Sequence, residues 1–497
     1  MISYARNCTG LIGLILCAVF LWSLLGIRLI HADDSLGISN RDKSPNIIFI
    51  LADDLGYGDL SSTGQKYFKT PNLDRMAEQG MFFSQHYSGS TVCAPSRSCL
   101  ITGQHTGHTP IRGNKEILPE GQHPLPEAAP SLPITLSKAG YVTGAFGKWG
   151  LGFPGSEGDP MKHFDRFYGY NCQRIGHHYY PHAIWDNDQQ VELAPNAGSA
   201  KGVYAPTLIH DQTLQFIEDN RDRRFFCYVP TVIPHAELAA PEAYMKQFRG
   251  AIEEGLPYEG YDEGVDFRNG PYQSQPEPRV AFAAMVSLLD QQVGEILDLL
   301  EKLGISDNTL VVFSSDNGPH QEGGADPEFF RSNAGFRGYK RDLYEGGIRV
   351  PLIVCWPGEI ENGSRSDHIS AFWDFLPTFA EIVGEVVPEG IDGISLLPTL
   401  LGEDDKQIKH DYLYWEFHER GGRIALRQGD WKAVKYDVLE NPDRPAELYN
   451  LVADPGEKVN LANSYPEILS RLESLMKSAR TESDVFTFQH KQYNAEK

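Results

Sequence analysis

The stretch Asn46-Ile47-Ile48-Phe49-Ile50-Leu51-Ala52 is an almost unbroken apolar run, and two acidic residues follow it directly. Apolar runs of this length are typical of strands that are buried on both faces of a parallel sheet. Similar runs recur at residues 141–146, 225–229, 309–314 and 352–356. The stretch therefore predicts one strand of a large, mainly parallel β-sheet.

Segments with helical periodicity separate these runs. In the clearest of them, residues 279–303, apolar side chains such as Met285, Leu289 and Val293 recur at helical spacing, and Gly304 follows as a stop signal. Strands that alternate with helices predict an α/β fold in which helices flank the sheet.

Two long stretches of the sequence show no clear periodicity. Residues 152–201 are rich in aromatic residues, His and Gly, and residues 236–278 are rich in Pro, Gly and Glu. Irregular segments of this length inside a domain usually serve function or are disordered. We expect both stretches to form walls of a binding site.

The residue composition and pattern change towards the C-terminus. Short aromatic and charged runs at residues 412–417 and 430–436 predict antiparallel strands, and a helix is expected at about residues 466–480. We therefore divide the chain into a main domain, residues 45–402, and a smaller C-terminal α/β subdomain that contains an antiparallel sheet, residues 403–497.

The overall charge restricts the classes of partner. Asp and Glu outnumber Lys and Arg by 67 to 44, which gives a formal net charge of −23 at pH 7. Nucleic-acid binding needs a clustered basic surface, so no nucleic-acid partner is expected. An anionic ligand would need a local basic pocket set into an acidic surface.

The N-terminal segment has the features of an export signal. Arg6 precedes an apolar run at residues 11–27, Arg28 follows it, and Ala32 provides a small residue for cleavage. We expect a signal peptide at residues 1–32, a periplasmic or secreted protein, and no stable membrane insertion after cleavage. The run lies at the lower limit for a membrane-spanning helix, so an uncleaved anchor stays an alternative.

The cysteine content does not indicate a disulfide scaffold. Of seven cysteines, two lie in the leader, and the rest are spread thinly over the body of the chain. These five are Cys93, Cys99, Cys172, Cys227 and Cys355. No disulfide pairing follows from their spacing.

Two pairs of hard-oxygen side chains follow predicted strands. Asp53 and Asp54 come directly after the first strand, and Asp316 and Asn317 follow the apolar run at residues 309–314. Ligands of open α/β sheets bind at the carboxyl ends of strands, and adjacent carboxylates repel each other unless a cation lies between them. Each pair alone is as typical of a turn or helix cap, but together they predict a shared metal site. Oxygen ligands suit calcium, and magnesium less well.

A third motif, Cys93-Ala94-Pro95-Ser96-Arg97, places a cysteine at fixed offsets from Pro and Arg. Pro95 fits the first turn of a helix, so Cys93 is expected at a helix N-terminus, where free amides favour anions. The motif resembles the maturation signature of the sulfatase family, in which a maturation enzyme oxidises this cysteine to the aldehyde formylglycine. The resemblance implies that Cys93 is a modified catalytic residue and that such an enzyme is a partner. An isolated cysteine is otherwise more often a small buried hydrophobic residue.

An aldehyde hydrate can perform both steps of the reaction, whereas a serine nucleophile cannot. The hydrate has two hydroxyls on one carbon: one can attack the sulfur of a sulfate ester, and the other can then lose its proton and expel sulfate. A serine hydroxyl could perform only the first of these steps. The result is covalent catalysis in two easier steps.

Further segments resemble the same family, in order along the chain. They are Ala52-Asp53-Asp54, Phe146-Gly147-Lys148-Trp149, Ile233-Pro234-His235, Ser315-Asp316-Asn317-Gly318, the segment at residues 343–351, which Lys340 precedes, and Ala446-Glu447-Leu448-Tyr449-Asn450-Leu451. The resemblance implies an alkaline phosphatase-like fold and a calcium ion that contacts a sulfate oxygen and the formylglycine at position 93. The implied calcium ligands are Asp53, Asp54, Asp316, Asn317 and the modified Cys93.

The resemblance also implies a set of cationic and acid–base groups. The residues are Arg97, Lys148, His235 and Lys340. In the family such groups bind sulfate, stabilise the anionic nucleophile and protonate the departing alcohol. Taken alone, a lysine or histidine in these positions is more often an ordinary surface or structural residue.

One position departs from the family pattern. Many members have a histidine two positions after the lysine, where it assists the aldehyde hydrate, but this chain has Gly150. We select His177, in a loop that contains three histidines, as a substitute and substrate contact, and His320, which follows the second metal pair, as another substrate contact.

Three interpretations follow from these patterns, two of them alternatives to the favoured one. The nearest enzymatic one is a phosphoester or phosphonate hydrolase of the same superfamily, but those relatives typically use Ser or Thr with two zinc ions. A non-catalytic protein that binds sulfated glycans is a second, because Gly150 replaces an expected histidine. The favoured interpretation is an arylsulfatase-like hydrolase of sulfated small molecules or glycans, whose aromatic segment at residues 164–185 could stack on sugar rings or on an aryl group.

Overall fold

The computed structural model describes residues 44–118 and 120–488. The predicted signal peptide lies outside this range. Strand β1 (Asn46–Ala52) lies near the middle of a ten-stranded sheet, whose order is β11-β2-β10-β9-β1-β8-β4-β5-β6-β7. The other strands are β2 (Met81–Phe83), β4 (Val142–Lys148), β5 (Arg166–Tyr170), β6 (Ala183–Asp186), β7 (Gln189–Glu192), β8 (Phe225–Pro230), β9 (Thr309–Ser315), β10 (Leu352–Cys355) and β11 (Ser364–Ser366).

The centre of this sheet is parallel. β1 pairs in parallel with β8 and with β9, and β4 pairs in parallel with β8 and with β5. β10 is antiparallel to both β9 and β2, and β6 and β7 form an antiparallel edge. The predicted large, mainly parallel sheet is therefore confirmed.

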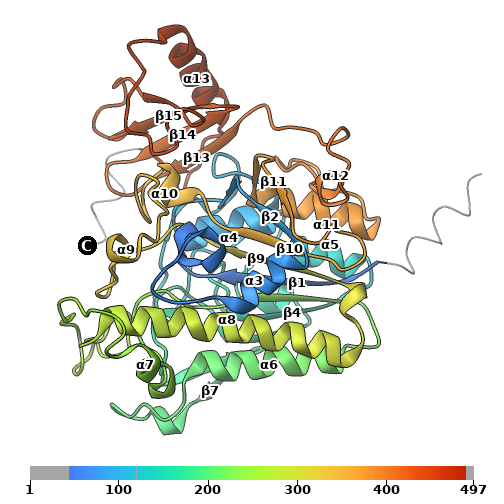
Figure 1. Ribbon diagram of the computed structural model, residues 1–497, viewed down its shortest axis with the longest axis vertical. Helices are drawn as coiled ribbons and strands as arrows, with labels where there is room; N and C mark the ends of the chain where they lie inside the picture. The colour runs from blue at the N-terminus through green and yellow to red at the C-terminus, as the bar shows by residue number, and fades with distance from the viewer. Residues whose placement is uncertain (1–43, 119, 489–497) are drawn as a thin grey trace, which may run out of the picture. The chain divides into compact units, whose positions relative to one another are not determined.

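Helices cover both faces of the sheet, as Figure 1 shows. The helices are α3 (Pro71–Glu78), α4 (Cys93–Thr102), α5 (Leu132–Lys138), α6 (Ala205–Asp219), α7 (Glu242–Phe248), α8 (Pro278–Leu303), α9 (Pro327–Phe330), α10 (Glu345–Ile348), α11 (Phe375–Val383), α12 (Leu397–Leu400) and α13 (Pro466–Ser478). Side chains of β1 alternate between the two layers: Ile48 and Ile50 pack in the core with α3, α6 and α8, and Phe49 packs with α4, α5 and α11. This alternation explains why the β1 sequence is apolar at every position.

The expectation that residues 152–201 are irregular is wrong. They contain strands β5, β6 and β7, and β5 extends the parallel sheet through its pairing with β4. The pattern is missed because a short edge strand is stabilised by its neighbour more than by its own periodicity. The second stretch, residues 236–278, is irregular apart from α7.

Helix α8 is the main helix of one core layer. Within the described part of the chain, it alone has the length and apolar composition of a membrane-spanning helix, but 83% of its most apolar window is buried inside the protein. It is therefore a core helix. The five cysteines outside the leader are buried and form no disulfide.

A separate antiparallel sheet follows, in the order β13-β14-β15-β16. Its strands are β13 (Leu413–Phe417), β14 (Arg423–Gln428), β15 (Trp431–Tyr436) and β16 (Glu447–Asn450). One face packs against Leu472 and Met476 of α13. This confirms the predicted antiparallel sheet. The described residues from Pro45 onward nevertheless form a single structural unit, so the boundary at residue 402 stays a prediction.

A buried ion cluster joins this sheet to the main body of the protein. Lys432 Nζ lies 2.9 Å from Glu345 Oε1 and 3.0 Å from Glu457 Oε1, and all three side chains are buried. The Tyr87 hydroxyl donates a hydrogen bond to Glu345 at 2.6 Å. The cluster therefore links α10 to β15.

We expect Lys432→Met to lower the free energy of unfolding by about 3–5 kcal/mol, because it leaves the buried Glu457 carboxylate without its cation and leaves Glu345 paired only with Arg349, at 3.3 Å, among the described residues. Urea unfolding measures this loss. The matched control is Lys406→Met, which removes an exposed ion pair with Glu403 and should cost about 1 kcal/mol or less. Equal losses in the two variants would contradict the structural role of the cluster.

Candidate active site

Cys93 is the first residue of α4 and is buried. Its thiol donates a hydrogen bond to Asp53 Oδ1 at 3.3 Å. Burial, and then the negative charge of Asp53, raise the pKa of the Cys93 thiol well above its usual range. Because the thiolate is the reactive form of cysteine, an unmodified Cys93 is a weak nucleophile in this position.

The two pairs of hard-oxygen side chains lie side by side at the carboxyl ends of strands β1 and β9. Ala52 of β1 is paired with Ser315 of β9, so the residues that follow these strands are adjacent. The backbone N–H of Asp54 donates to Asp316 Oδ1 at 3.1 Å, and Asn317 Nδ2 donates to Asp54 Oδ1 at 2.6 Å. All four side chains are buried: Asp53, Asp54, Asp316 and Asn317.

Three buried cations surround these carboxylates. Arg97 donates from Nε and Nη2 to Asp316 Oδ2, at 3.1 and 2.8 Å. Lys148, the last residue of β4, forms an ion pair with Asp53, and Arg97 also donates to the Lys148 carbonyl. Lys340 donates to Asp54 Oδ2 at 2.8 Å. This is the local basic pocket that an anionic ligand needs in an acidic protein.

The residues fit a hard cation. Burial and the nearby charge of Asp53 raise the pKa of Asp316, as expected for carboxylates that share a site. Asn317 Oδ1 is buried and has no hydrogen-bond partner among the described residues. The donor atoms are carboxylate and amide oxygens, which calcium prefers. His235 also lies nearby, but Lys340 donates to its Nε2 and its Nδ1 faces the Ala236 carbonyl, so neither nitrogen is free for a metal.

Lys340 and His235 form a hydrogen-bonded pair. Lys340 Nζ lies 2.9 Å from His235 Nε2 and 3.3 Å from Glu322 Oε2. Burial alone lowers the pKa of Lys340, but Asp54 and Glu322 outweigh burial and raise it well above its usual range. Burial, Lys340 and Lys148 lower the pKa of His235 well below its usual range. The pair therefore consists of a protonated lysine and a neutral imidazole.

Both histidines selected as substrate contacts flank His235. The rings of His177 and His235 stack with centroids 4.7 Å apart, and those of His235 and His320 stack at 5.7 Å. Burial and Lys148 lower the pKa of His177 to about 3, so this ring is also neutral. The structure thus brings all the predicted site residues together at one sheet edge.

Some residues around this site were not predicted from the sequence. Glu322 accepts hydrogen bonds from Lys340 and, at 3.1 Å, from the Tyr272 hydroxyl. It also forms an ion pair with Arg341. The only sequence signal for Glu322 is its position shortly after the second metal pair. Tyr272 and Arg341 had no recognisable pattern, because chain segments far apart in sequence bring them to the site.

The aromatic segment at residues 164–185 was expected to stack on a ligand, but most of it is buried. Most of its rings, including Phe167, Tyr170 and Tyr179, are buried in the core. The Tyr179 hydroxyl donates to the carbonyls of Val232 and His235, which anchors the His235 loop. These rings support the site and do not form a stacking surface for sugars.

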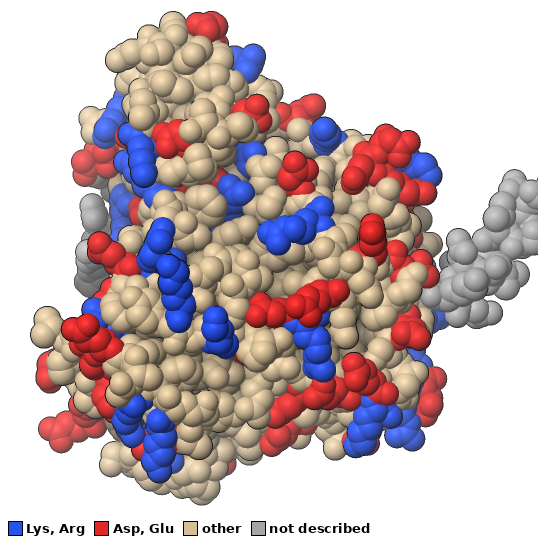
Figure 2. All heavy atoms as spheres, viewed as in Figure 1, with Lys and Arg blue, Asp and Glu red and all other residues tan. Residues whose placement is uncertain are grey.

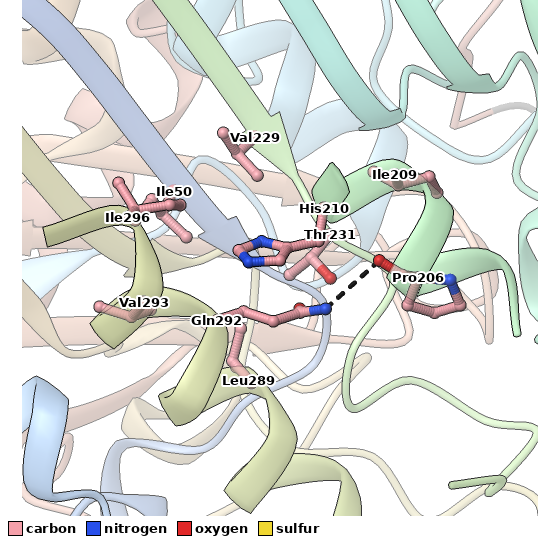
Figure 3. A pocket seen from close by; sticks show the side chains of 10 residues that line it. All are labelled: Ile50, Pro206, Ile209, His210, Val229, Thr231, Leu289, Gln292, Val293 and Ile296. Atoms are coloured by element: carbon pink, nitrogen blue, oxygen red, sulfur yellow. Dashed lines mark hydrogen bonds between the residues drawn. The ribbon is translucent and has the colours of Figure 1, made fainter. Parts of the chain in front are cut away.

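A small cavity lies away from this site, between α6, α8, β1 and β8 (Figure 3). Its volume is about 20 Å³, enough for about one water molecule. Mostly apolar side chains line it, and Gln292 donates to the Pro206 carbonyl at 3.3 Å across it. It offers no room for a substrate.

Comparison with known proteins identifies the family. The family model described as "Sulfatase" matches residues 45–385, and that described as "N-sulphoglucosamine sulphohydrolase, C-terminal" matches residues 335–482. The N-acetylgalactosamine-6-O-sulfatase of Bacteroides thetaiotaomicron is 28% identical, over 89% of this chain and 94% of that relative. The human N-acetylgalactosamine-6-sulfatase is 30% identical, over 89% of this chain and 86% of that relative.

A solved structure has the same fold. The crystal structure of Ps i-CgsB in complex with k-i-k-neocarrahexaose matches with a TM-score of 0.72 and 27% identity, over 88% of this chain and 93% of that chain. The family model spans most of the chain and includes both strand ends that provide the acidic pairs. The protein belongs to the sulfatase family and is a sulfatase.

Proposed function

We propose that this sulfatase releases inorganic sulfate from sulfated carbohydrates, using a formylglycine formed from Cys93 and a calcium ion. The observation that supports this most directly is the buried Cys93 thiol, hydrogen-bonded to Asp53 in a pocket of carboxylates and cations. A protonated thiol there has little use as a nucleophile, whereas an oxidised residue can react. The names of the N-acetylgalactosamine-6-sulfatase relatives support the carbohydrate substrate.

The calcium ion and the formylglycine each have a specific role in this proposal. Calcium would be held by Asp53, Asp54, Asp316 and Asn317, and would supply positive charge to a sulfate oxygen and to the group at position 93. The hydrated aldehyde at position 93 would supply the hydroxyl that attacks sulfur and the second hydroxyl that permits sulfate release.

The cations of the chain bind and orient the sulfate group. Lys148 and Lys340 are buried and form ion pairs with Asp53 and Asp54, respectively. Their Nζ atoms are therefore held in place at the pocket. Arg97 is fixed by two hydrogen bonds to Asp316 and by the Lys148 carbonyl. Preorganised charges of this kind stabilise a developing anion without reorganisation cost.

Protonation of the leaving alcohol is assigned to His235 with Lys340. Lys340 donates to His235 Nε2 at 2.9 Å, so the protonated lysine is in direct contact with the neutral imidazole. The His235 imidazole is neutral in the free site, and a bound sulfate anion would raise its pKa because opposite charges favour the imidazolium. His177 and His320 hold the His235 ring between them and are proposed to contact the substrate.

The two alternatives receive less support. A phosphatase-like two-zinc site needs several histidine ligands, whereas the groups around Cys93 are mainly carboxylates and cations. A binding protein without catalysis would not need the Cys93 and acidic residues that this chain retains. Weak phosphatase or phosphonate side activity is compatible with the site.

We also propose that the protein is exported, to the periplasm or the medium, and that a formylglycine-generating enzyme acts on it. Figure 2 shows acidic and basic side chains interspersed over one face, without a broad basic patch there. The formal net charge of −23 is the reason that we propose a small anionic substrate and no nucleic-acid partner.

The proposal is tested with protein produced with and without the maturation enzyme. We expect the matured protein to release sulfate from N-acetylgalactosamine 6-sulfate and from 4-nitrophenyl sulfate, and the unmatured protein to release almost none. 4-Nitrophenyl phosphate should react far more slowly. Turnover of the aryl ester with no release from a panel of sulfated sugars would contradict the carbohydrate substrate, and faster phosphate than sulfate release would favour the phosphatase alternative.

A further inference from the structure

The chain around Gly150 is held close to the segment that follows β5. Lys148 of β4 is paired with Tyr170 of β5, and the ladder continues beyond both strands. The N–H of Trp149 donates to the Tyr170 carbonyl at 2.9 Å, and that of Gly150 to the Asn171 carbonyl at 3.1 Å. Residues 149–150 and 170–171 therefore run side by side at the sheet edge that holds the active site.

The side chain of Gln173 fills the space beside Gly150. A Cβ atom added to Gly150 would lie 1.9 Å from Gln173 Nε2 and 2.9 Å from its Cδ. Gly150 also has a φ of +71°, which side chains rarely adopt. The Gln173 amide thus occupies the volume in which a side chain of residue 150 would begin.

The amides of Gln173 and Asn171 are buried without partners. Asn171 is 0% exposed and Gln173 is 6% exposed. Within the described residues, neither the nitrogen nor the oxygen of either side-chain amide has a hydrogen-bond partner. Buried polar groups are nearly always hydrogen-bonded, and an exception calls for an explanation. Two adjacent exceptions beside an active site indicate groups that await a ligand.

The segment that follows these residues lines the active site. A Cβ atom on Gly176 would lie 2.8 Å from Lys148 Cδ, so this turn packs directly on the Lys148 side chain. The next residue, His177, stacks on His235. Asn171 and Gln173 therefore lie in the short segment between the end of β5 and this turn, and Gln173 packs against Gly150, two residues after Lys148.

We propose that the side-chain amides of Asn171 and Gln173 form a neutral subsite that hydrogen-bonds an oxygen atom in the sulfatase pocket, in place of a side chain at position 150. This inference rests on the proposed function. The oxygen belongs either to the substrate or to the converted residue 93. An amide can donate and accept hydrogen bonds but does not transfer protons at neutral pH, so the subsite positions its ligand and leaves proton transfer to His235 and Lys340.

Two substitutions test the subsite. Gln173→Ala removes the amide, and Gln173→Glu keeps its shape but replaces the donor with a carboxylate. The control is Asn220→Ala, which removes another buried amide. Asn220 follows the end of α6 and lies near the start of β8, whereas the active site lies at the carboxyl ends of the strands. Thermal unfolding shows that the compared variants are folded at the assay temperature.

Sulfate release from N-acetylgalactosamine 6-sulfate and 4-nitrophenyl sulfate is measured as kcat and KM for each variant. We expect kcat/KM of Gln173→Ala to fall about 10- to 100-fold, the range for one hydrogen bond to a charged or polar ligand, and that of Gln173→Glu to fall further because its carboxylate repels sulfate. Asn220→Ala should keep the wild-type value. Wild-type kinetics for both Gln173 variants would overturn the inference.

A binding experiment separates the two sources of the oxygen. N-acetylgalactosamine 6-sulfate is titrated calorimetrically into Cys93→Ala protein with and without Gln173→Ala. Weaker binding in the double variant assigns the subsite to the substrate, whereas unchanged binding with reduced kcat on both esters assigns it to residue 93. Unchanged binding and unchanged kinetics overturn the inference. A wild-type protein that binds the sugar but releases no sulfate contradicts the proposed function instead, and the titration still tests the subsite.

Discussion

Cys93→Ala is expected to reduce sulfate release by about 10⁴-fold or more, because removal of a covalent nucleophile leaves only the contribution of binding and electrostatics. The buried pocket of Arg97, Lys148 and Lys340 would remain and could still bind the ester. We therefore expect kcat to collapse while the affinity for substrate changes little. The rate of sulfate release, followed by ion chromatography, measures the effect.

Cys93→Ser separates the two steps of the reaction. A serine hydroxyl can attack sulfur but has no second hydroxyl to expel sulfate, so this variant should become sulfated once and then stop. Mass spectrometry of the peptide that contains position 93 would detect the trapped sulfate ester. Repeated turnover by Cys93→Ser would contradict the need for an aldehyde.

The matched control for both variants is Cys99→Ala. Cys99 lies in the same helix, is equally buried and donates only to the Gly89 carbonyl, at 3.4 Å. We expect Cys99→Ala to lower stability modestly through lost packing and to keep its activity. Undiminished release by Cys93→Ala, or an equal loss in Cys99→Ala, would refute the assignment of the nucleophile.

Removal of calcium is expected to have the second largest effect. Chelation should abolish sulfate release and lower the melting temperature, and added calcium should restore both. The physical reason is that Asp53, Asp54 and Asp316 lie together in a buried pocket, where their mutual repulsion is no longer offset by the ion. At a calcium concentration about 100 times its Kd, binding would stabilise the folded state by about 2.7 kcal/mol.

Asp316→Asn shows whether the effect comes from this site. The substitution keeps the shape of the side chain but removes one negative charge, so more calcium should be needed for half-maximal activity and for half the thermal shift. The control is Asp374→Asn, a buried carboxylate that accepts hydrogen bonds from the backbone N–H groups of Ala371 and Ile394. That control should lower stability without moving the calcium titration. Full activity after exhaustive chelation would rule out an essential calcium ion.

The sequence predicted most of the sheet and the main core helix because their signals are local. The run at residues 309–314 becomes β9 (Thr309–Ser315), and the pattern at 279–303 becomes α8 (Pro278–Leu303). The direction of β10 could not be read, since an apolar run is equally suited to a parallel or an antiparallel buried strand. Strands β5–β7 were missed because pairing at the sheet edge, more than periodicity, stabilises them.

The candidate site was predicted in part. The two pairs of oxygen ligands at strand ends predicted a shared metal site, and the pairing of β1 with β9 places Asp53 and Asp316 together. The role proposed for Gln173 could not be recognised from the sequence, because it depends on the space beside Gly150. The two residues are brought together only by the fold. The same holds for Glu322, whose bond to Lys340 is formed only when two loops meet.

By itself, the sequence determined the groups available for chemistry: a cysteine in a maturation motif, two pairs of oxygen ligands and a few cations at predicted strand ends. Only the tertiary structure decided their charges and partners. Burial removes the water that would otherwise solvate each group separately, so the Cys93 thiol keeps its proton and His235 stays neutral, whereas the charges of Asp54 and Glu322 keep the buried Lys340 protonated. These states depend on distances between segments far apart in the chain, which local patterns do not encode.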